Sequence, residues 1–239
     1  RQARTYVPLA ATVTAGPFQA ESDPATGDYR MRVISGTFDI SAVAPDHVTT
    51  NVIGLNAQDG QAIRQDFYLD PICGIISNDA ELGNQDWTAA SPWAITDESA
   101  HSPNHSWTDS PGGNYYNNSD VSLLSPILDL SGYRGMTLSF WHIFKLEEGY
   151  DYGKVEYSTD RGQNWQTLAS YTGQSTTAWT PQTFSLPALD GQPETRLRFR
   201  LFSDARITTD GWYIDDILLT GGGPACVNPV AAFTSDSPV

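Results

Sequence analysis

The feature that most limits how this chain folds is the alternation of apolar and polar residues in segments separated by glycine and proline. The segments "MTLSFWHIF", "GKVEYSTD", "TRLRFRLFSD" and "WYIDDILLT" all have this period of two and are rich in β-branched and aromatic residues. Successive side chains of a strand point to opposite faces, so the spacing predicts β-strands. In the third segment, arginines alternate with Leu197, Phe199 and Leu201, as in a sheet with one solvated face. Helical periodicity is almost absent, and the predicted fold class is all-β.

The charge balance restricts the partners that this chain can bind. Acidic side chains number 28 against 13 basic ones, which gives a formal net charge of -15. Nucleic-acid binding depends on lysine and arginine to neutralise phosphates, so a nucleic-acid partner is not expected. No apolar run approaches the roughly 20 residues of a membrane span. The composition is typical of a secreted or cell-surface protein, and "RQARTYVPLA" lacks a signal peptide, so we expect a mature or excised fragment.

The two cysteines, Cys73 and Cys226, lie far apart and beside turn-rich segments, "DPICG" and "GGGPACVNP". Their separation excludes a CxxC redox or zinc motif. In an oxidising compartment they would form a disulfide that joins the two ends of the intervening domain. The alternative is a pair of small buried thiols.

Residues 158–165, "STDRGQNW", fit the Ser-x-Asp-x-Gly-x-x-Trp pattern of the Asp box, which is best known from sialidase propellers. The pattern predicts a hairpin in which Asp160 accepts backbone N–H groups, Gly162 is left-handed and Trp165 packs under the loop. A propeller requires the motif to recur at the period of a blade. There is no second copy, so the octad predicts a structural turn.

Composition divides the chain at residue 71 and again near residues 222–224. Residues 1–71 contain Thr26-Gly27-Asp28-Tyr29 and later Gly36-Thr37-Phe38-Asp39-Ile40-Ser41-Ala42. This part resembles the carboxypeptidase-regulatory-like domain, which implies a small transthyretin-like β-sandwich. Such domains are stiff spacers and are rarely catalytic.

Residues 72–222 contain the Trp87 and Trp93 pair, "HSPNHSW", "LLSPILDLSGY", "LSFWHIF", "DYGKVEYSTDRGQNW" and "GWYIDDILL" in one order. This part resembles the MAM-like jelly roll found beside secreted bacterial peptidases, including the immune inhibitor A type. The resemblance implies a larger antiparallel jelly-roll sandwich, and this family carries one Asp-box turn of its own. Residues 223–239 are interpreted as a linker and the start of a further domain, because "PVAAFTSDSPV" is similar to the start of a PKD domain.

These resemblances imply a non-catalytic accessory region of a secreted peptidase of the subtilisin-like or zinc type. The expected partners are the catalytic domain of the same parent chain and a protein or polysaccharide surface. The alternatives are a carbohydrate-binding or adhesion module and a structural component of a cell-surface assembly.

The residues themselves predict no enzyme and no catalytic side chain. His101 and His105 have the spacing of a zinc pair, but "SPN" between them cannot form the required helical turn. His142 lies inside a strand pattern and is interpreted as a packed imidazole. Paired carboxylates for glycoside hydrolysis would be sought in "KLEEGYDYG", with Glu147, Glu148 and Asp151. A solvated hairpin tip is the favoured interpretation of that segment.

Calcium is the predicted cofactor, with a structural role. Ca²⁺ prefers six to eight oxygen ligands, and jelly rolls commonly hold it where their first and last strands meet. The opening "SNDAELGNQDW" and the closing "YIDDIL" supply candidate ligands, which are Asp79, Glu81, Asp215 and Asp216. Adjacent aspartates of a strand point to opposite faces, so at most one of the last two is expected to bind. The alternative is a set of hydrogen-bonded carboxylates that hold the strand ends.

A glycan platform is a further hypothesis, because aromatic rings stack on sugars. Its candidate members are Trp107, Tyr115, Tyr116 and Trp179. The alternative is that these side chains belong to the core.

Overall fold

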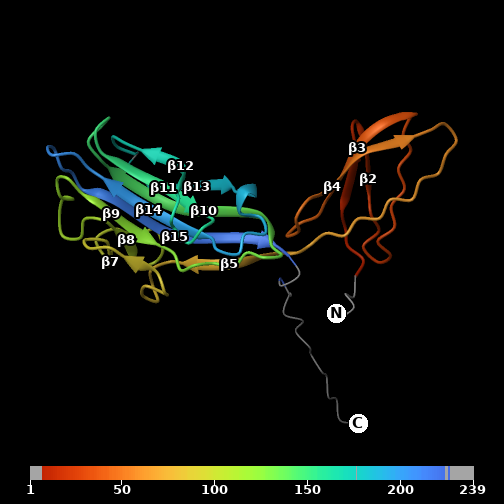
Figure 1. Ribbon diagram of the computed structural model, residues 1–239. Coiled ribbons are helices and arrows are strands. Elements are labelled where there is room, and N and C mark those ends of the chain that lie inside the picture. The colour runs from red at the N-terminus through yellow and green to blue at the C-terminus, as the bar shows by residue number, and fades with distance from the viewer. Residues whose placement is uncertain (1–6, 176, 224–225, 227–239) are drawn as a thin grey trace, which may run out of the picture. The chain divides into compact units, whose positions relative to one another are not determined.

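The structure is a computed structural model that describes residues 7–175, 177–223 and 226. Figure 1 shows that strands make up nearly all of its regular structure. The one helical element in the described part of the chain is the short 3₁₀ turn η1 (Pro187–Leu189). The predicted all-β class is therefore confirmed. The chain divides into two compact units, and the second unit consists of residues 74–221.

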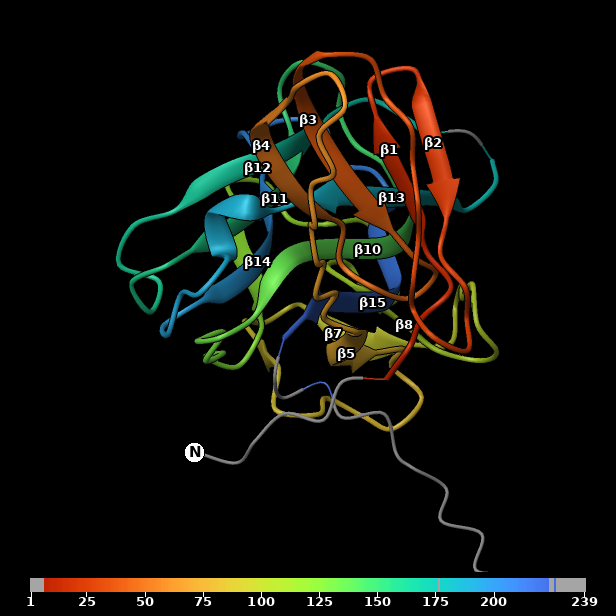
Figure 2. The same ribbon diagram turned by 90° about the vertical axis from the view of Figure 1, so that its right-hand side faces the viewer.

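The first unit contains a four-stranded antiparallel sheet in the order β2-β1-β3-β4 (Figure 2). Its core consists of Val13, Ala15, Ile40 and Ala42, which are small or branched side chains on one face of the sheet. The strands of this unit are β1 (Thr12–Ala15), β2 (Phe18–Glu21), β3 (Gly36–Val43) and β4 (Thr50–Ala57).

The segment before β3 packs on this core as an extended chain with no assigned strand. Tyr29, Met31 and Val33 contact the core while the residues between them are exposed, as the alternation predicts. The Tyr29 hydroxyl donates a hydrogen bond to the Gln65 carbonyl oxygen at 2.8 Å, and its ring lies against Phe67. The covering layer of this unit is thus held by side chains.

The second unit consists of two sheets packed face to face (Figure 1). One has the order β13-β10-β15-β8-β7, with β5 also paired to β15, and the other has the order β12-β11-β14-β9-β6. The strands of the unit are β5 (Ile72–Asn78), β6 (Thr88–Ala89), β7 (Ala94–Thr96), β8 (Ser106–Thr108), β9 (Asp120–Leu124), β10 (Arg134–Lys145), β11 (Tyr152–Ser158), β12 (Gln166–Tyr171), β13 (Thr180–Ser185), β14 (Arg196–Phe202) and β15 (Gly211–Gly222).

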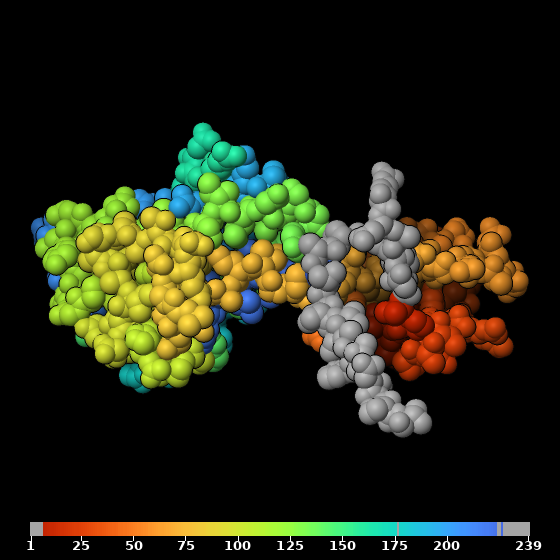
Figure 3. Space-filling model, turned by 90° about the horizontal axis from the view of Figure 1, so that it is seen from below, coloured from red at the N-terminus to blue at the C-terminus, as the bar shows by residue number. Residues whose placement is uncertain are grey.

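Large aromatic and aliphatic side chains fill the space between these two sheets. Trp212, Phe140 and Phe199 are almost fully buried, and their rings meet edge to face. In the space-filling view of Figure 3, the yellow and yellow-green segment with β6 to β8 covers much of the face of this unit turned to the viewer. This segment also carries the loop that contains His101 and His105.

The Asp box forms the hairpin between β11 and β12, as predicted. Asp160 accepts the Asn164 N–H at 2.9 Å, and this bond holds the pKa of the Asp160 carboxyl down at about 2. Gly162 has a φ of 91°, and the indole of Trp165 packs directly against it. The Arg198 guanidinium lies 4.0 Å from the centre of the Trp165 ring. The octad is therefore a packed turn.

Cys73 and Cys226 are joined by a disulfide, with their Cα atoms 5.5 Å apart. Cys73 directly precedes the second unit, and Cys226 follows its last residue, Gly221, by five positions. The bond thus ties the chain entering this unit to the chain leaving it. The predicted further domain in residues 223–239 lies outside the described residues, apart from Gly223 and Cys226.

Candidate functional site

Three acidic side chains, Glu147, Asp151 and Asp204, come together in the second unit and are named the acidic pocket. Glu147 lies two residues after β10, Asp151 directly precedes β11, and Asp204 lies two residues after β14. The register of β11 against β14 pairs Tyr152 with Phe202, which brings the last two carboxylates together. One oxygen atom from each of the three side chains lies within 4.8 Å of the others. Residues that are more than 50 positions apart thus form one cluster.

Tyr115 fixes the geometry of this pocket. Its hydroxyl donates a hydrogen bond to Asp151 Oδ2 at 2.6 Å and accepts the Glu147 N–H at 3.1 Å. Burial, followed by the bond to Asp151, raises the pKa of Tyr115 to about 12, so the phenol keeps its proton. Asp151 is fully buried, and its Oδ1 accepts the Asp204 N–H at 2.7 Å.

Glu147 is the member of the pocket whose carboxylate has a buried oxygen without a hydrogen bond among the described residues. Burial raises the pKa of its carboxyl, and repulsion from Asp204 and Asp151 acts in the same direction. Its Oε2 is buried and has no hydrogen-bond partner among the described residues. A bound cation would offset both the burial and the repulsion. Carboxylate oxygens are the ligands that Ca²⁺ and Mg²⁺ prefer, so the residues present fit a hard cation.

The carboxylates predicted as metal ligands hold the loop of residues 98–105. Asp215 Oδ2 accepts the N–H groups of His101 and Ser102 at 2.8 and 2.9 Å. Asp216 contacts the same two residues, at His101 Nδ1 and Ser102 Oγ, both at 2.6 Å. The expectation that the two aspartates face opposite ways is wrong, because Asp216 has a φ of 50° and interrupts the alternation.

Glu81 holds the other end of this loop. Its Oε1 accepts the N–H groups of Asn104 and His105 at 2.8 and 2.7 Å, and its Oε2 contacts His105 Nδ1. Asp79 caps its own turn by accepting the Glu81 N–H at 3.1 Å. A cation at these carboxylates would have to displace these donors. The hydrogen-bonded arrangement is the alternative that the sequence left open.

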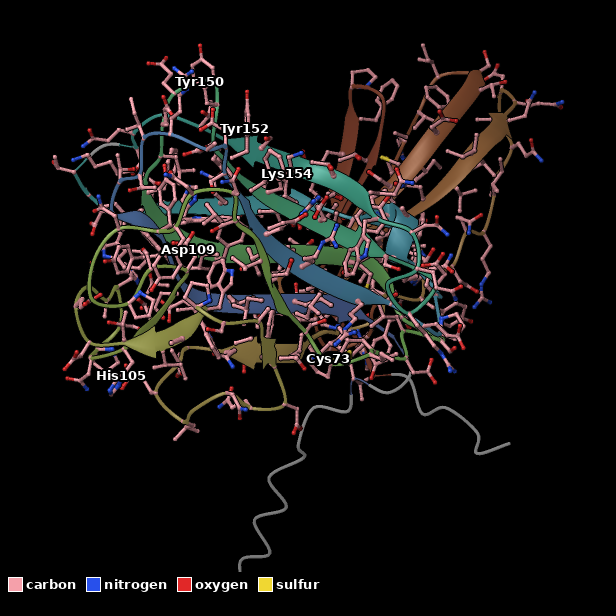
Figure 4. The ribbon with its side chains drawn as sticks, turned by 60° about the vertical axis from the view of Figure 1, so that its left-hand side comes forward. Cys73, His105, Asp109, Tyr150, Tyr152 and Lys154 are labelled. Carbon is pink, nitrogen blue, oxygen red and sulfur yellow. A yellow bond between two sulfur atoms is a disulfide. The ribbon has the colours of Figure 1, made fainter. Side chains whose placement is uncertain are left out.

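The histidines of this unit are engaged in structural contacts. His101 stacks on Trp141 with ring centres 3.8 Å apart, and His105 lies beside Glu81 near the periphery in Figure 4. His142 is buried, and its Nδ1 accepts the Trp212 Nε1–H at 3.2 Å. Burial lowers the pKa of His142 to about 4, so this imidazole is neutral at pH 7.

The predicted glycan platform is wrong for two of its four members. Trp107 and Tyr115 are 2% and 1% exposed. Trp107 lies on β8, inside the sheet, and donates its indole N–H to Asn78 Oδ1, while Tyr115 points to Asp151. Tyr116 is 67% exposed, and Trp179 is half-buried near His101. Sequence reasoning missed Trp141, whose place on the outer face follows from the alternation of β10.

A groove of about 480 Å³ lies on the outer face of the first of the two sheets. Ile143 of β10 and Tyr213 of the neighbouring strand β15 form its floor. The loops that contain Glu98, Gln174 and Asp210 form its walls. Ile143 lies two residues after Trp141, so the stacked pair of Trp141 and His101 lies on the same face as the groove.

Comparison with known proteins gives one family model and one curated relative. The family model for Reelin subrepeat B matches residues 152–220. Bacillopeptidase F of Bacillus subtilis (strain 168) is 36% identical over 110 residues, which are 45% of this chain. These residues amount to 7% of that protein's length, so the chain spans only a small part of it.

Solved structures with a similar chain path include adhesin and carbohydrate-binding domains. The K3 cleaved adhesin domain of Lys-gingipain from Porphyromonas gingivalis W83 is 19% identical with a TM-score of 0.43. The alignment includes 62% of this chain and 99% of that domain. The module TmCBM61, solved with β-1,4-galactotriose, is 16% identical with a TM-score of 0.42, and 62% of this chain covers 97% of it. Within the described residues, no helix has the length and apolar character needed to cross a membrane.

Proposed function

We propose that this chain is a non-catalytic accessory region of a secreted bacterial peptidase, which contacts substrate, a partner or a surface. The identity to Bacillopeptidase F over 110 residues carries this proposal. The burial of His142, whose Nδ1 accepts the Trp212 indole N–H, supports it, because a general base needs an accessible ring nitrogen. We assign residues 1–71 to a carboxypeptidase-regulatory-like domain and 72–222 to a MAM-like domain, with a PKD-like start in 223–239.

The test is an assay of the purified chain with peptide and glycoside substrates in calcium-containing buffer. We expect no turnover above buffer, together with retention on an insoluble protein or polysaccharide matrix. Glu147→Gln is the diagnostic variant, because Glu147 belongs to a group of three carboxylates whose oxygens lie within 4.8 Å of one another. Hydrolysis by the purified chain that this variant abolishes would overturn the proposal.

We further propose that calcium binds in the acidic pocket of Glu147, Asp151 and Asp204 and stabilises the second unit. Three carboxylates in mutual reach, one with an unpartnered buried oxygen, support this assignment. A native-state ligand at one hundred times its dissociation constant stabilises the fold by about 2.7 kcal/mol. Melting temperature should therefore rise when calcium is added to chelator-treated protein.

Matched variants distinguish calcium binding in this pocket from calcium binding at the carboxylates predicted from the sequence. Asp204→Asn should abolish calcium binding in a calorimetric titration, and Glu148→Gln, on an exposed neighbour, should leave it unchanged. Glu81→Gln and Asp216→Asn remove carboxylates from the loop of residues 98–105. Binding that survives Asp204→Asn and disappears in Glu81→Gln would move the metal to that loop.

Polysaccharide contact is a second candidate function. The exposed ring of Tyr116 and the half-buried Trp179 beside His101 favour it. A glycan array with the purified chain tests this function, and binding that is lost in Trp179→Ala would support it.

A further inference from the structure

The groove on the outer face of β10 and β15 has an uneven charge distribution. Two carboxylates line it, those of Glu98 and Asp210, and Lys145 is the one basic residue in its lining. No ion pair joins either carboxylate to a basic side chain within the described residues. The chain as a whole carries a net charge of -15, which adds to the attraction of cations.

The Tyr213 hydroxyl lies between these two carboxylates. It is 3.5 Å from Glu98 Oε2 and 3.4 Å from Asp210 Oδ1, and the residue is only 6% exposed. Burial raises the pKa of Tyr213, and the two carboxylates add to this effect, so the phenol keeps its single proton. One proton serves one acceptor at a time. Glu98 Oε1 also accepts the Gly112 N–H at 2.7 Å, and the remaining lone pairs of the two carboxylates keep acceptor capacity.

The floor of the groove is largely apolar. Ile143 lies there with the ring of Tyr213, and Phe144 also lines the groove. An alkyl chain can lie along such a floor while its charged end reaches the carboxylates, as long basic side chains do at protein surfaces. Arginine suits this arrangement, because its fork of N–H groups can donate to two acceptors at once.

We propose that this groove binds a basic side chain, arginine or lysine, of a polypeptide partner. The inference rests on the proposed accessory function, and it names the chemistry of the surface that the module contacts. A sugar is disfavoured here, because the described lining of the groove contains no tryptophan and the indole of Trp141 on the same face is covered on one side by His101.

The test is a titration of the whole chain with Ac-Gly-Gly-Arg-Gly-Gly-amide, followed by NMR chemical shifts and by calorimetry. The matched peptide carries citrulline, which keeps the shape of arginine and removes the charge. We expect the arginine peptide to bind about tenfold more tightly than the citrulline peptide, because a hydrogen bond with a charged donor contributes a free energy of that order. The difference should shrink between 50 mM and 500 mM salt.

Variants complete the test. The double variant Glu98→Gln with Asp210→Asn should bind arginine and citrulline peptides equally, and Asp97→Asn, on an exposed neighbour outside the groove, should bind as the original chain does. Lys145→Gln should tighten binding. Equal affinity for both peptides in the original chain, or no binding of the arginine peptide at millimolar concentration, would overturn the proposal. Hydrolysis of a peptide would instead count against the non-catalytic function, so the two failures are distinguishable.

Discussion

Asp109 offers the sharpest test of the packing of the second unit. The residue directly follows β8, is fully buried and lies within the body of the fold in Figure 4, whereas Tyr150 is exposed at a hairpin tip. Its Oδ1 accepts the Trp212 N–H at 3.3 Å, and its Oδ2 has no partner among the described residues. Burial raises the pKa of Asp109 from 3.8 to about 7, and repulsion from Asp210 adds to this effect.

A raised acid pKa has a defined effect on stability. The folded state holds the Asp109 proton more tightly than the unfolded chain does. The resulting contribution to the free energy of unfolding is complete below pH 3.8 and is lost as pH rises through about 7. This difference in pKa corresponds to about 4 kcal/mol of unfolding free energy. Asp109→Asn keeps the shape and removes the charge. The variant should therefore gain up to about 4 kcal/mol of unfolding free energy relative to the original chain between pH 4 and pH 8.

Urea unfolding followed by tryptophan fluorescence measures this effect. All seven tryptophans lie between residues 87 and 212, so the signal reports on the second unit alone. Asp97→Asn is the control, because it makes the same change of charge at an exposed position. A difference in free energy between Asp109→Asn and the original chain that stays constant with pH would refute the assignment of a neutral buried carboxyl.

Two further predictions concern packing and the covalent bond. Gly153→Ala places a Cβ 2.6 Å from Trp212 Cε3 and should cost about 1–3 kcal/mol in the same assay, while Gly113→Ala, which meets open space, should cost less than 0.5 kcal/mol. Joint replacement of Cys73 and Cys226 by serine opens a loop of 153 residues and should lower stability by up to about 5 kcal/mol. Equal unfolding midpoints with and without the cysteines would contradict the second prediction.

Features set by neighbouring residues were predictable from the sequence. The alternation along β14 gives Leu197, Phe199 and Leu201 to the core, and all three have no exposed surface. The Asp-box turn also followed from local geometry, because its hydrogen bonds join residues at most four positions apart. A strand's alternation and a turn's hydrogen bonds depend on the backbone of that segment alone.

Features set by distant residues were not predictable in the same way. Glu147 and Asp151 had been noted as acidic, yet the third member of the pocket, Asp204, reaches them only through the register of β11 with β14. The expected opposite facing of Asp215 and Asp216 on β15 failed because a single left-handed residue, Asp216, breaks the alternation. Trp107 lies in a polar stretch of sequence, and its burial follows from the pairing of β8 between β7 and β15.

The acidic pocket and the groove are connected by hydrogen bonds around Tyr115. The N–H of Tyr115 donates to the Thr209 carbonyl oxygen, directly before Asp210 of the groove, and its hydroxyl binds Asp151 and the Glu147 N–H. The Thr209 hydroxyl donates to the carbonyl oxygen of Lys145 at 2.5 Å. The same short segments therefore carry the walls of both sites.

This connection predicts that calcium in the pocket alters the affinity of the groove for a basic side chain. A cation that orders Glu147 and Asp204 also orders the residues beside Lys145 and Asp210. Calcium should therefore tighten binding of the arginine peptide by about 5-fold or more. The peptide should tighten calcium binding by the same factor. Tyr115→Phe, which removes the shared hydroxyl, should reduce this factor while leaving the groove's carboxylates in place. The measurement is a pair of calorimetric titrations of the peptide, one with calcium and one with chelator. Equal peptide affinity in both would mean that the two sites act independently.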